Sequence, residues 1–102
     1  MGEDSLQGLY LKNVKSGEET QLPVDGMFVF VGYEPQNSFL PAGLELDPQG
    51  FIITDCEMRT NLPGLFAAGD IRSKMCRQVT TAVGDGATAA TAAFTYLEQL
   101  DA

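Results

Sequence analysis

The chain has 102 residues, of which 44% are hydrophobic, and it carries a formal net charge of −8. This length allows one small domain, and this apolar content is typical of a folded chain rather than a disordered one. The acidic balance argues against binding to nucleic acid or to an anionic membrane, because both require a basic face. No apolar run in the sequence approaches the ~20 residues of a membrane-spanning helix.

The first part of the chain predicts a β-hairpin followed by a buried strand. Gly8–Val14 and Glu19–Pro23 are candidate strands separated by turn residues. Met27–Val31 is a continuous apolar run, which is typical of a central strand covered on both faces. Pro35 then breaks regular structure, so we expect a loop around it.

The middle of the chain predicts short elements only. Ser38–Leu40 is a candidate for one helical turn, and Leu44–Pro48 is expected to be extended. Phe51–Ile53 is a candidate for a short strand. A polar connector, Asp55–Asn61, follows it.

A second apolar run, Leu65–Ala68, predicts another strand buried on both faces. Gly69 removes the side chain where the chain leaves this strand, and Asp70 places a carboxylate at the strand's C-terminal edge. In open α/β sheets, ligands bind at this edge.

A long helix is expected from about Gln78 onward. Its apolar residues recur every three or four positions and form a stripe that must be buried against something: Val79, Val83, Ala87, Ala90, Phe94 and Leu97. Glycine and alanine leave its first half thin, so other backbone or a flat ligand can approach closely. Unpaired N–H groups and the positive end of the helix dipole lie near Gln78 and Val79.

Three runs, Pro63–Asp70, Arg77–Val79 and Gly84–Gly86, together resemble the C-terminal end of low-molecular-weight bacterial thioredoxin reductases. These enzymes are flavin- and pyridine-nucleotide-dependent disulfide reductases. The resemblance covers nearly the whole chain but only the last third of such an enzyme. It implies an α/β fragment of a two-domain FAD/NAD(P)-binding fold, with a β-hairpin and short strands followed by one long C-terminal helix. Residues 1–36 would end the NADPH domain, and residues 37–102 would be the C-terminal part of the FAD domain.

The resemblance also implies cofactor-binding roles at Gly69, Asp70, Arg77, Gln78 and Val79, and no catalytic or metal-binding residue in this chain. Asp70 resembles the acidic residue that accepts hydrogen bonds from the ribityl hydroxyls of FAD; the alternative is a turn aspartate. Arg77, Gln78 and Val79 resemble the segment whose helix-start amides face the flavin pyrimidine ring, and Gly69 is expected to act by packing and close approach. The alternatives there are a solvated surface cation at Arg77 and an ordinary helix-start residue at Gln78.

The implied parent reaction passes electrons from NADPH through FAD to a dithiol and on to a thioredoxin-like disulfide protein. This chain has no Cys-x-x-Cys and no Gly-x-Gly-x-x-Gly. We therefore expect it to contribute part of the flavin site, and to be inactive and free of FAD and NADPH when alone. The alternative is a free-standing, self-associating α/β binding or structural module without redox activity.

The two cysteines, Cys56 and Cys76, are far apart, which is typical of a reduced cytoplasmic protein. Cys76 lies beside Arg77 near the helix start, a setting that favours a reactive thiol, but an incidental thiol is the favoured interpretation at both positions. The absence of histidine makes a zinc site unexpected. The acidic first residues, with no apolar run behind them, predict no signal peptide.

Self-association is also expected. An uncovered edge at Met27–Val31 would be a template for pairing with another chain, and the helix stripe would add a second apolar surface. The net charge of −8 opposes unlimited aggregation, so a homodimer is the expected product.

Overall fold

The computed structural model describes residues 2–102. The chain forms two compact units, Met1–Gly32 and Tyr33–Ala102. The first unit is built on a hairpin, and the second contains short bridged loops and one long helix. The candidate site residues all belong to the second unit.

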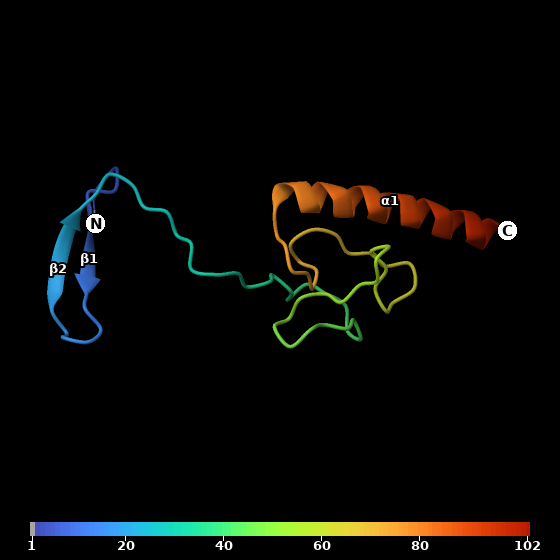
Figure 1. Ribbon diagram of the computed structural model, residues 1–102, viewed down its shortest axis with the longest axis horizontal. Helices are drawn as coiled ribbons and strands as arrows, with labels where there is room; N and C mark the ends of the chain where they lie inside the picture. The colour runs from blue at the N-terminus through green and yellow to red at the C-terminus, as the bar shows by residue number, and fades with distance from the viewer. Residues whose placement is uncertain (1) are drawn as a thin grey trace. The chain divides into compact units, whose positions relative to one another are not determined.

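The regular elements of the described residues are β1 (Gly8–Lys12), β2 (Glu19–Pro23) and α1 (Val79–Asp101), as Figure 1 shows. β1 and β2 pair as an antiparallel sheet in which Tyr10 lies opposite Gln21. The predicted order of a hairpin and one long C-terminal helix is therefore confirmed.

The hairpin turn is stabilised by a side chain. Asn13 Oδ1 accepts hydrogen bonds from the backbone N–H groups of Lys15 at 2.9 Å and Ser16 at 3.1 Å. Asparagine commonly closes turns in this way. Because the turn begins at Asn13, β1 ends at Lys12 rather than at Val14, where the sequence placed its end.

The prediction of a buried strand at Met27–Val31 is wrong for this chain. The segment belongs to no strand pair among the described residues, and Phe28 and Val31 are 100% and 91% exposed. A strand forms only where neighbouring strands supply hydrogen-bond partners and cover its faces. The hairpin strands pair with each other and not with this segment.

Isolated bridges replace strands in the second unit. Ile52 bridges Leu46 in antiparallel fashion and Arg72 in parallel fashion, and Arg59 bridges Phe66. The short strand expected at Phe51–Ile53 therefore occurs as single bridges at Ile52. The core residues that these bridges help to bury are Phe51, Ile52, Met58, Ala67 and Ala92.

The expectation of a strand buried on both faces at Leu65–Ala68 is also corrected. Only Phe66 forms a bridge, and only Ala67 of the four is buried. One neighbouring segment, residues 58–60, bonds to this run, through Ala67 N to Met58 O at 3.0 Å and Thr60 N to Leu65 O at 3.1 Å. A run paired on one side only does not become a central strand.

α1 begins where the sequence predicted it. Gln78 precedes the helix in an extended conformation, and its backbone N–H donates to Thr81 Oγ1 at 3.1 Å. Ala82 N donates to Gln78 O at 3.0 Å and so closes the first turn. This side chain-to-backbone bond is the local signal that fixes the helix start.

The face of α1 that packs on its own unit consists mainly of small residues, and we call it the inner face: Ala82, Asp85, Ala89, Ala92 and Tyr96. In the same unit, α1 runs alongside the loops that contain Gly64 and Phe66 (Figure 1). The rings of Phe66 and Tyr96 meet edge to face with centroids 6.2 Å apart. A Cβ added at Gly64 would lie 3.5 Å from the Tyr96 ring.

The apolar stripe of the helix lies on the opposite side, and we call it the outer face: Val79, Val83, Ala87, Ala90, Phe94 and Leu97. Val79 is 80% exposed and Leu97 is 58% exposed. The chain itself therefore leaves this stripe uncovered, which agrees with the expectation of a second exposed apolar surface. The small inner-face residues let the loop backbone come closer than the larger outer-face side chains would allow.

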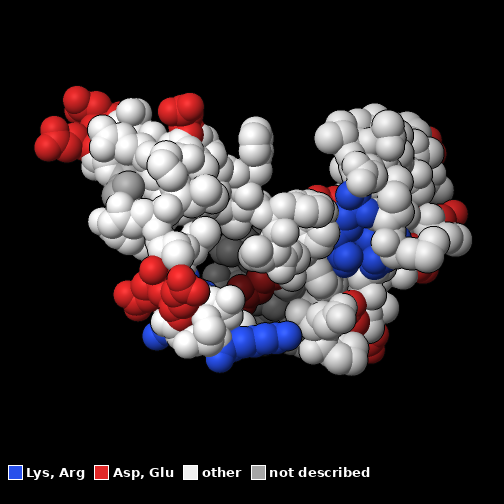
Figure 2. Space-filling model, turned by 60° about the vertical axis from the view of Figure 1, so that its left-hand side comes forward, with Lys and Arg blue, Asp and Glu red and all other residues white. Residues whose placement is uncertain are grey.

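Acidic side chains lie at several separate places on the surface (Figure 2), in keeping with the net charge of −8. Across residues 2–102, no helix combines the length and apolar character needed to cross a membrane.

Candidate functional site

The loop that precedes α1 is attached to the helix through a glycine. Gly69 has a φ of 85°, a conformation that residues with a Cβ rarely adopt. Its N–H donates to Asp85 Oδ2 at 3.0 Å. A Cβ at Gly69 would lie 3.8 Å from the Ala82 side chain, an ordinary contact, so the φ rather than the space requires glycine.

Asp85 is the centre of a nearly buried charge cluster. Arg72 Nη1 and Lys74 Nζ each lie 2.8 Å from the same oxygen, Asp85 Oδ2. The side chains of Asp85 and Lys74 are only 12% and 9% exposed. Arg72 also donates from Nε to Thr54 Oγ1 at 2.8 Å, so its guanidinium is fixed on two sides.

The cluster keeps Asp85 ionised. Burial by itself raises the pKa of this carboxyl, but hydrogen bonds from Lys74, Arg72 and the Gly69 N–H outweigh it and lower the pKa from 3.8 to about 2. Two cations therefore face one carboxylate at neutral pH. The arrangement fastens the segment from Gly69 to Lys74 against the inner face of α1.

Arg77 is held in place rather than left to solvent. Its Nε donates to the Asp70 carbonyl at 2.9 Å, and its Nη2 donates to the Arg72 carbonyl at 2.8 Å. The guanidinium carbon lies 3.7 Å from the centroid of the Phe51 ring, a cation–π contact. These contacts fold residues 70–77 into a closed loop.

Asp70 and Arg77 line one cavity of about 340 Å³, which we call the Asp70–Arg77 pocket. Its walls are largely apolar and aromatic, and the residues that form them are Tyr33, Glu34, Pro35, Gln36, Phe39, Phe51, Asp70, Ile71 and Arg77. A mostly apolar cavity with a few charged groups is the usual form of a small-molecule site.

The other three predicted site residues lie outside the walls of this pocket. Gly69 holds the loop against α1 through the hydrogen bond from its N–H to Asp85. Gln78 gives its own N–H to Thr81, and Val79 begins the helix with an exposed side chain. The structure thus brings Asp70 and Arg77 together at one pocket. Gly69 lies next to Asp70 in the sequence, and Gln78 and Val79 follow Arg77, but none of these three lines the pocket.

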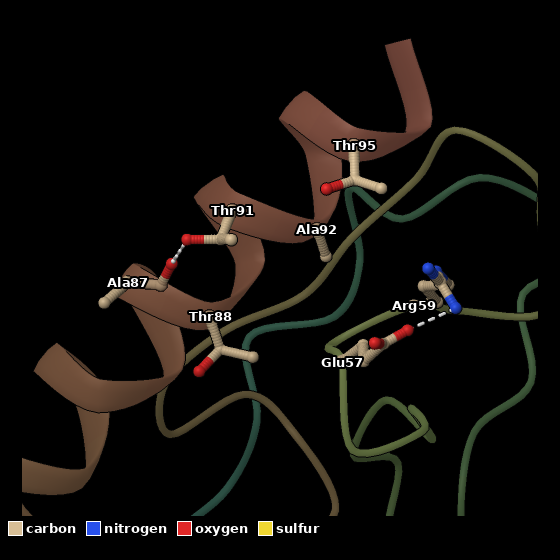
Figure 3. A pocket seen from close by; sticks show the side chains of 7 residues that line it. All are labelled: Glu57, Arg59, Ala87, Thr88, Thr91, Ala92 and Thr95. Atoms are coloured by element: carbon tan, nitrogen blue, oxygen red, sulfur yellow. Dashed lines mark hydrogen bonds and ion pairs between the residues drawn. The ribbon is translucent and has the colours of Figure 1, made fainter. Parts of the chain in front are cut away.

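A second cavity, of about 330 Å³, lies between α1 and the loop of residues 57–59 (Figure 3). Thr88 and Thr91 face it, but their hydroxyls donate to the carbonyls of Gly84 at 3.0 Å and Ala87 at 2.9 Å. Arg59 forms an ion pair with Glu57. The dashed lines in Figure 3 mark two of these interactions, from Thr91 to the Ala87 carbonyl and between Arg59 and Glu57.

The two cysteines, Cys56 and Cys76, are free and exposed. Over the described part of the chain, no group of three or more histidine, cysteine or carboxylate side chains is arranged to hold a metal ion.

The sequence reasoning missed Arg72, Lys74 and Asp85 as site-forming residues. One signal was present: Asp85 falls three residues after Ala82 and four before Ala89, on the helix face made of small residues. An aspartate is unfavourable inside a helix and on a buried face unless a cation meets it. That position alone asks for a basic partner.

Comparison with known proteins gives a consistent result. The model of the family described as pyridine nucleotide-disulphide oxidoreductase matches residues 2–86. A thioredoxin reductase of Treponema pallidum is 48% identical over 99 residues, which are 97% of this chain and 32% of that protein. A thioredoxin reductase of Listeria monocytogenes is 50% identical over 96 residues, which are 93% of this chain and 30% of that protein.

Solved structures give the same picture. The crystal structure of thioredoxin reductase from Streptococcus pyogenes superposes with a TM-score of 0.74 and 43% identity, and it covers 97% of this chain and 33% of that one. The family resemblance and the expected fold class are thereby confirmed. The chain spans about a third of the length of these relatives.

Proposed function

The chain belongs to the pyridine nucleotide-disulphide oxidoreductase family, and from that premise we propose that it is a segment of a thioredoxin reductase-like flavoprotein that supplies part of the flavin site. The parent protein would take electrons from NADPH through FAD to a dithiol and on to a thioredoxin-like disulfide protein. Bound FAD would supply the two-electron chemistry, and the residues of this chain would bind and orient it.

The Asp70–Arg77 pocket carries this proposal. An ionised carboxylate only accepts hydrogen bonds, so Asp70 suits a ligand rich in hydroxyl groups, such as the ribityl chain of a flavin. Arg77 and the start of α1 provide positive charge close by. A helix N-terminus stabilises a nearby anion, such as a reduced flavin, by ~0.3–1 kcal/mol, or up to ~2 kcal/mol when partly buried.

The size of the pocket favours a shared site. A cavity of about 340 Å³ is at the small end of ligand pockets. It fits part of a dinucleotide, and the remaining walls would come from the rest of the parent protein. Gly69, Gln78 and Val79 would contribute through backbone placement at the loop and the helix start.

We assign residues 1–36 to the end of the NADPH-domain-like part and residues 37–102 to the FAD-domain-like part. The boundary between the two compact units, at Gly32 and Tyr33, supports a division in this region. The exposed free cysteines support a reducing, cytoplasmic setting.

Flavin retention tests the proposal. In the full-length flavoprotein that contains this segment, Asp70→Ala should lower the amount of FAD that copurifies, while Glu98→Ala should leave it unchanged. Both residues are exposed carboxylates, but Glu98 lies near the far end of α1. Flavin absorbance per mole of protein measures the effect, and equal flavin content in the two variants would contradict the role of Asp70.

The 102-residue chain alone should neither oxidise NADPH nor purify with FAD. Its sequence contains no Cys-x-x-Cys and no glycine-rich phosphate-binding loop. NADPH oxidation that depends on this chain alone would overturn this part of the proposal.

A second candidate function is that of a self-associating module without redox activity. The observation that favours it is the exposed outer face of α1, together with the exposed apolar segment Met27–Val31. We propose a homodimer that covers one or both surfaces. Sedimentation equilibrium at micromolar concentration measures it, and a single monomeric species would contradict it.

A further inference from the structure

A continuous series of contacts joins the inner face of α1 to the Asp70–Arg77 pocket. Asp85 Oδ2 accepts from Arg72 Nη1 at 2.8 Å. The Arg72 carbonyl in turn accepts from Arg77 Nη2 at 2.8 Å, and Arg77 Nε donates to the Asp70 carbonyl at 2.9 Å. Asp85 itself lines no part of the pocket.

Each step in this series fixes the next. The Arg72 side chain is bonded to Asp85 and to Thr54, which lie on different segments, so its guanidinium cannot shift without breaking a bond. The backbone of Arg72 is also held, because its N–H donates to the Gly69 carbonyl at 3.1 Å. The acceptor that positions Arg77 is therefore held through its backbone, by Gly69 and the Ile52–Arg72 bridge, and through its side chain, by the cluster around Asp85.

We propose that Asp85 is a positioning residue for the Asp70–Arg77 pocket, which acts by holding Arg72, and through it Arg77, at the pocket wall. This role rests on the proposed flavin function, because positioning Arg77 matters for binding only if the pocket takes a ligand.

The position of Asp85 in the helix supports a specific role in addition to its contribution to stability. An alanine there would continue the small inner face of Ala82, Ala89 and Ala92 and would favour the helix. A nearly buried ion cluster gives little net stability compared with an apolar substitute, but its geometry allows few alternatives. Asp85 Oδ2 accepts three hydrogen bonds, from Gly69, Arg72 and Lys74, and so holds this segment of the loop at one point.

Hydrogen exchange at the Arg77 side chain tests the proposal without any flavin. In the 102-residue chain, the Nε–H signal of Arg77 reports its bond to the Asp70 carbonyl. Asp85→Asn should speed exchange of this proton by about tenfold, the factor expected when a charge-assisted hydrogen bond in the supporting cluster is lost. The backbone amides of Ala89 and Ala92 in α1 should be accelerated less than this proton, because they report only the loss of stability of the unit.

Glu98→Gln is the matched control, because it removes one carboxylate from the same helix at an exposed position. It should leave Arg77 Nε–H exchange unchanged. Unchanged Arg77 exchange in Asp85→Asn would overturn the proposal, as would an equal acceleration at Arg77 and at the helix amides, which would reveal only a general loss of structure.

Arg72→Lys keeps the proposal testable if Asp85→Asn does not fold. Lysine keeps the charge opposite Asp85 but loses the planar group that also bonds Thr54. Selective acceleration at Arg77 supports the proposal, and no acceleration overturns it. Arg59→Lys makes the same substitution at a half-exposed ion pair and is the control, which should leave Arg77 Nε–H exchange unchanged.

FAD content in the full-length protein separates this inference from the proposed function. If Asp85→Asn speeds Arg77 exchange while Asp70→Ala leaves flavin content unchanged, the positioning role is supported and the flavin function is contradicted. If Asp70→Ala lowers flavin content while Asp85→Asn leaves Arg77 exchange unchanged, the flavin function is supported and the positioning role is overturned.

Discussion

The two faces of α1 differ in their residues and in their surroundings. The inner face is composed of alanines, one tyrosine and one aspartate, and it packs against the loops of its own unit. The outer face has the larger apolar side chains, Val79, Val83, Phe94 and Leu97, and all four are exposed. By hydrophobicity alone, the outer face would be expected inside.

The difference shows that side-chain size and charge pairing determine which way this helix turns. Ala82 allows the Gly69 backbone to approach, and the cluster around Asp85 adds charge-assisted bonds that the outer face has no groups to make. The apolar outer face is then available to a surface outside the unit, which is why we propose that another copy or the rest of a parent protein covers it.

The largest effect should come from removing the inner-face charge. Asp85→Ala leaves Arg72 and Lys74 without their shared acceptor, and it should destabilise the second unit by about 3 kcal/mol at neutral pH. Urea unfolding followed by circular dichroism measures this. If the loss is below the error of extrapolation, the cluster does not hold the inner face.

The inner face should also weaken in acid. The pKa of Asp85 is about 2 in the folded chain, compared with an ordinary value of 3.8. Because the folded value is the lower one, the stabilisation is fully present above pH ~4 and is lost as the pH falls through ~2, in total ~2 kcal/mol.

Unfolding free energies measured across this pH range should show that loss, and Asp85→Asn should show less of it. Asp47, whose pKa is also lowered, chiefly by a hydrogen bond from Ser73, remains in both proteins and provides a common background. An identical acid dependence in both would assign the effect to other carboxyls.

Two glycines, one in the loop that packs on the inner face and one in the exposed part of α1, differ in backbone conformation. Gly69→Ala should cost about 1–2 kcal/mol, because its φ of 85° is strained for any residue with a Cβ. Gly84→Ala should stabilise the chain by ~0.5–1 kcal/mol, since Gly84 is exposed in the helix and a Cβ there meets nothing within 4 Å. Thermal melts of the two variants should therefore shift in opposite directions.

The smallest effect on folding should come from the outer face. Leu97→Ser should change the unfolding free energy of the second unit by no more than about 0.5 kcal/mol, because the side chain is already 58% exposed. The same substitution should weaken self-association in sedimentation equilibrium. A large loss of stability without any change in association would show that this face is covered within the chain.

Local sequence signals were sufficient for the hairpin and the helix start. Asn13 closes a turn and Thr81 caps a helix through bonds to residues two to three positions away, so the pattern is readable along the chain. The apolar runs Met27–Val31 and Leu65–Ala68 predicted buried strands, but strands depend on partners that are distant in sequence. Among the described residues, Met27–Val31 belongs to no strand pair, and Leu65–Ala68 is paired on one side only.

The candidate site was predictable in part. The family motif pointed to Asp70 and Arg77, which line one pocket. The cluster around Asp85 was missed, because it joins residues 11 and 13 positions apart that meet only once the helix has packed. Helical periodicity identified an apolar face, but it does not say whether that face turns toward the chain or away from it.

The convergence of three donors on Asp85 Oδ2 also has an evolutionary consequence. In a related protein with a neutral residue at this position, the cations corresponding to Arg72 and Lys74 would lie nearly buried with no counter-charge. Selection would then act on all three positions together, and substitutions at 72 and 74 should accompany substitutions at 85 across the family. Surface cations such as Lys12 and Lys15 should vary without any such linkage.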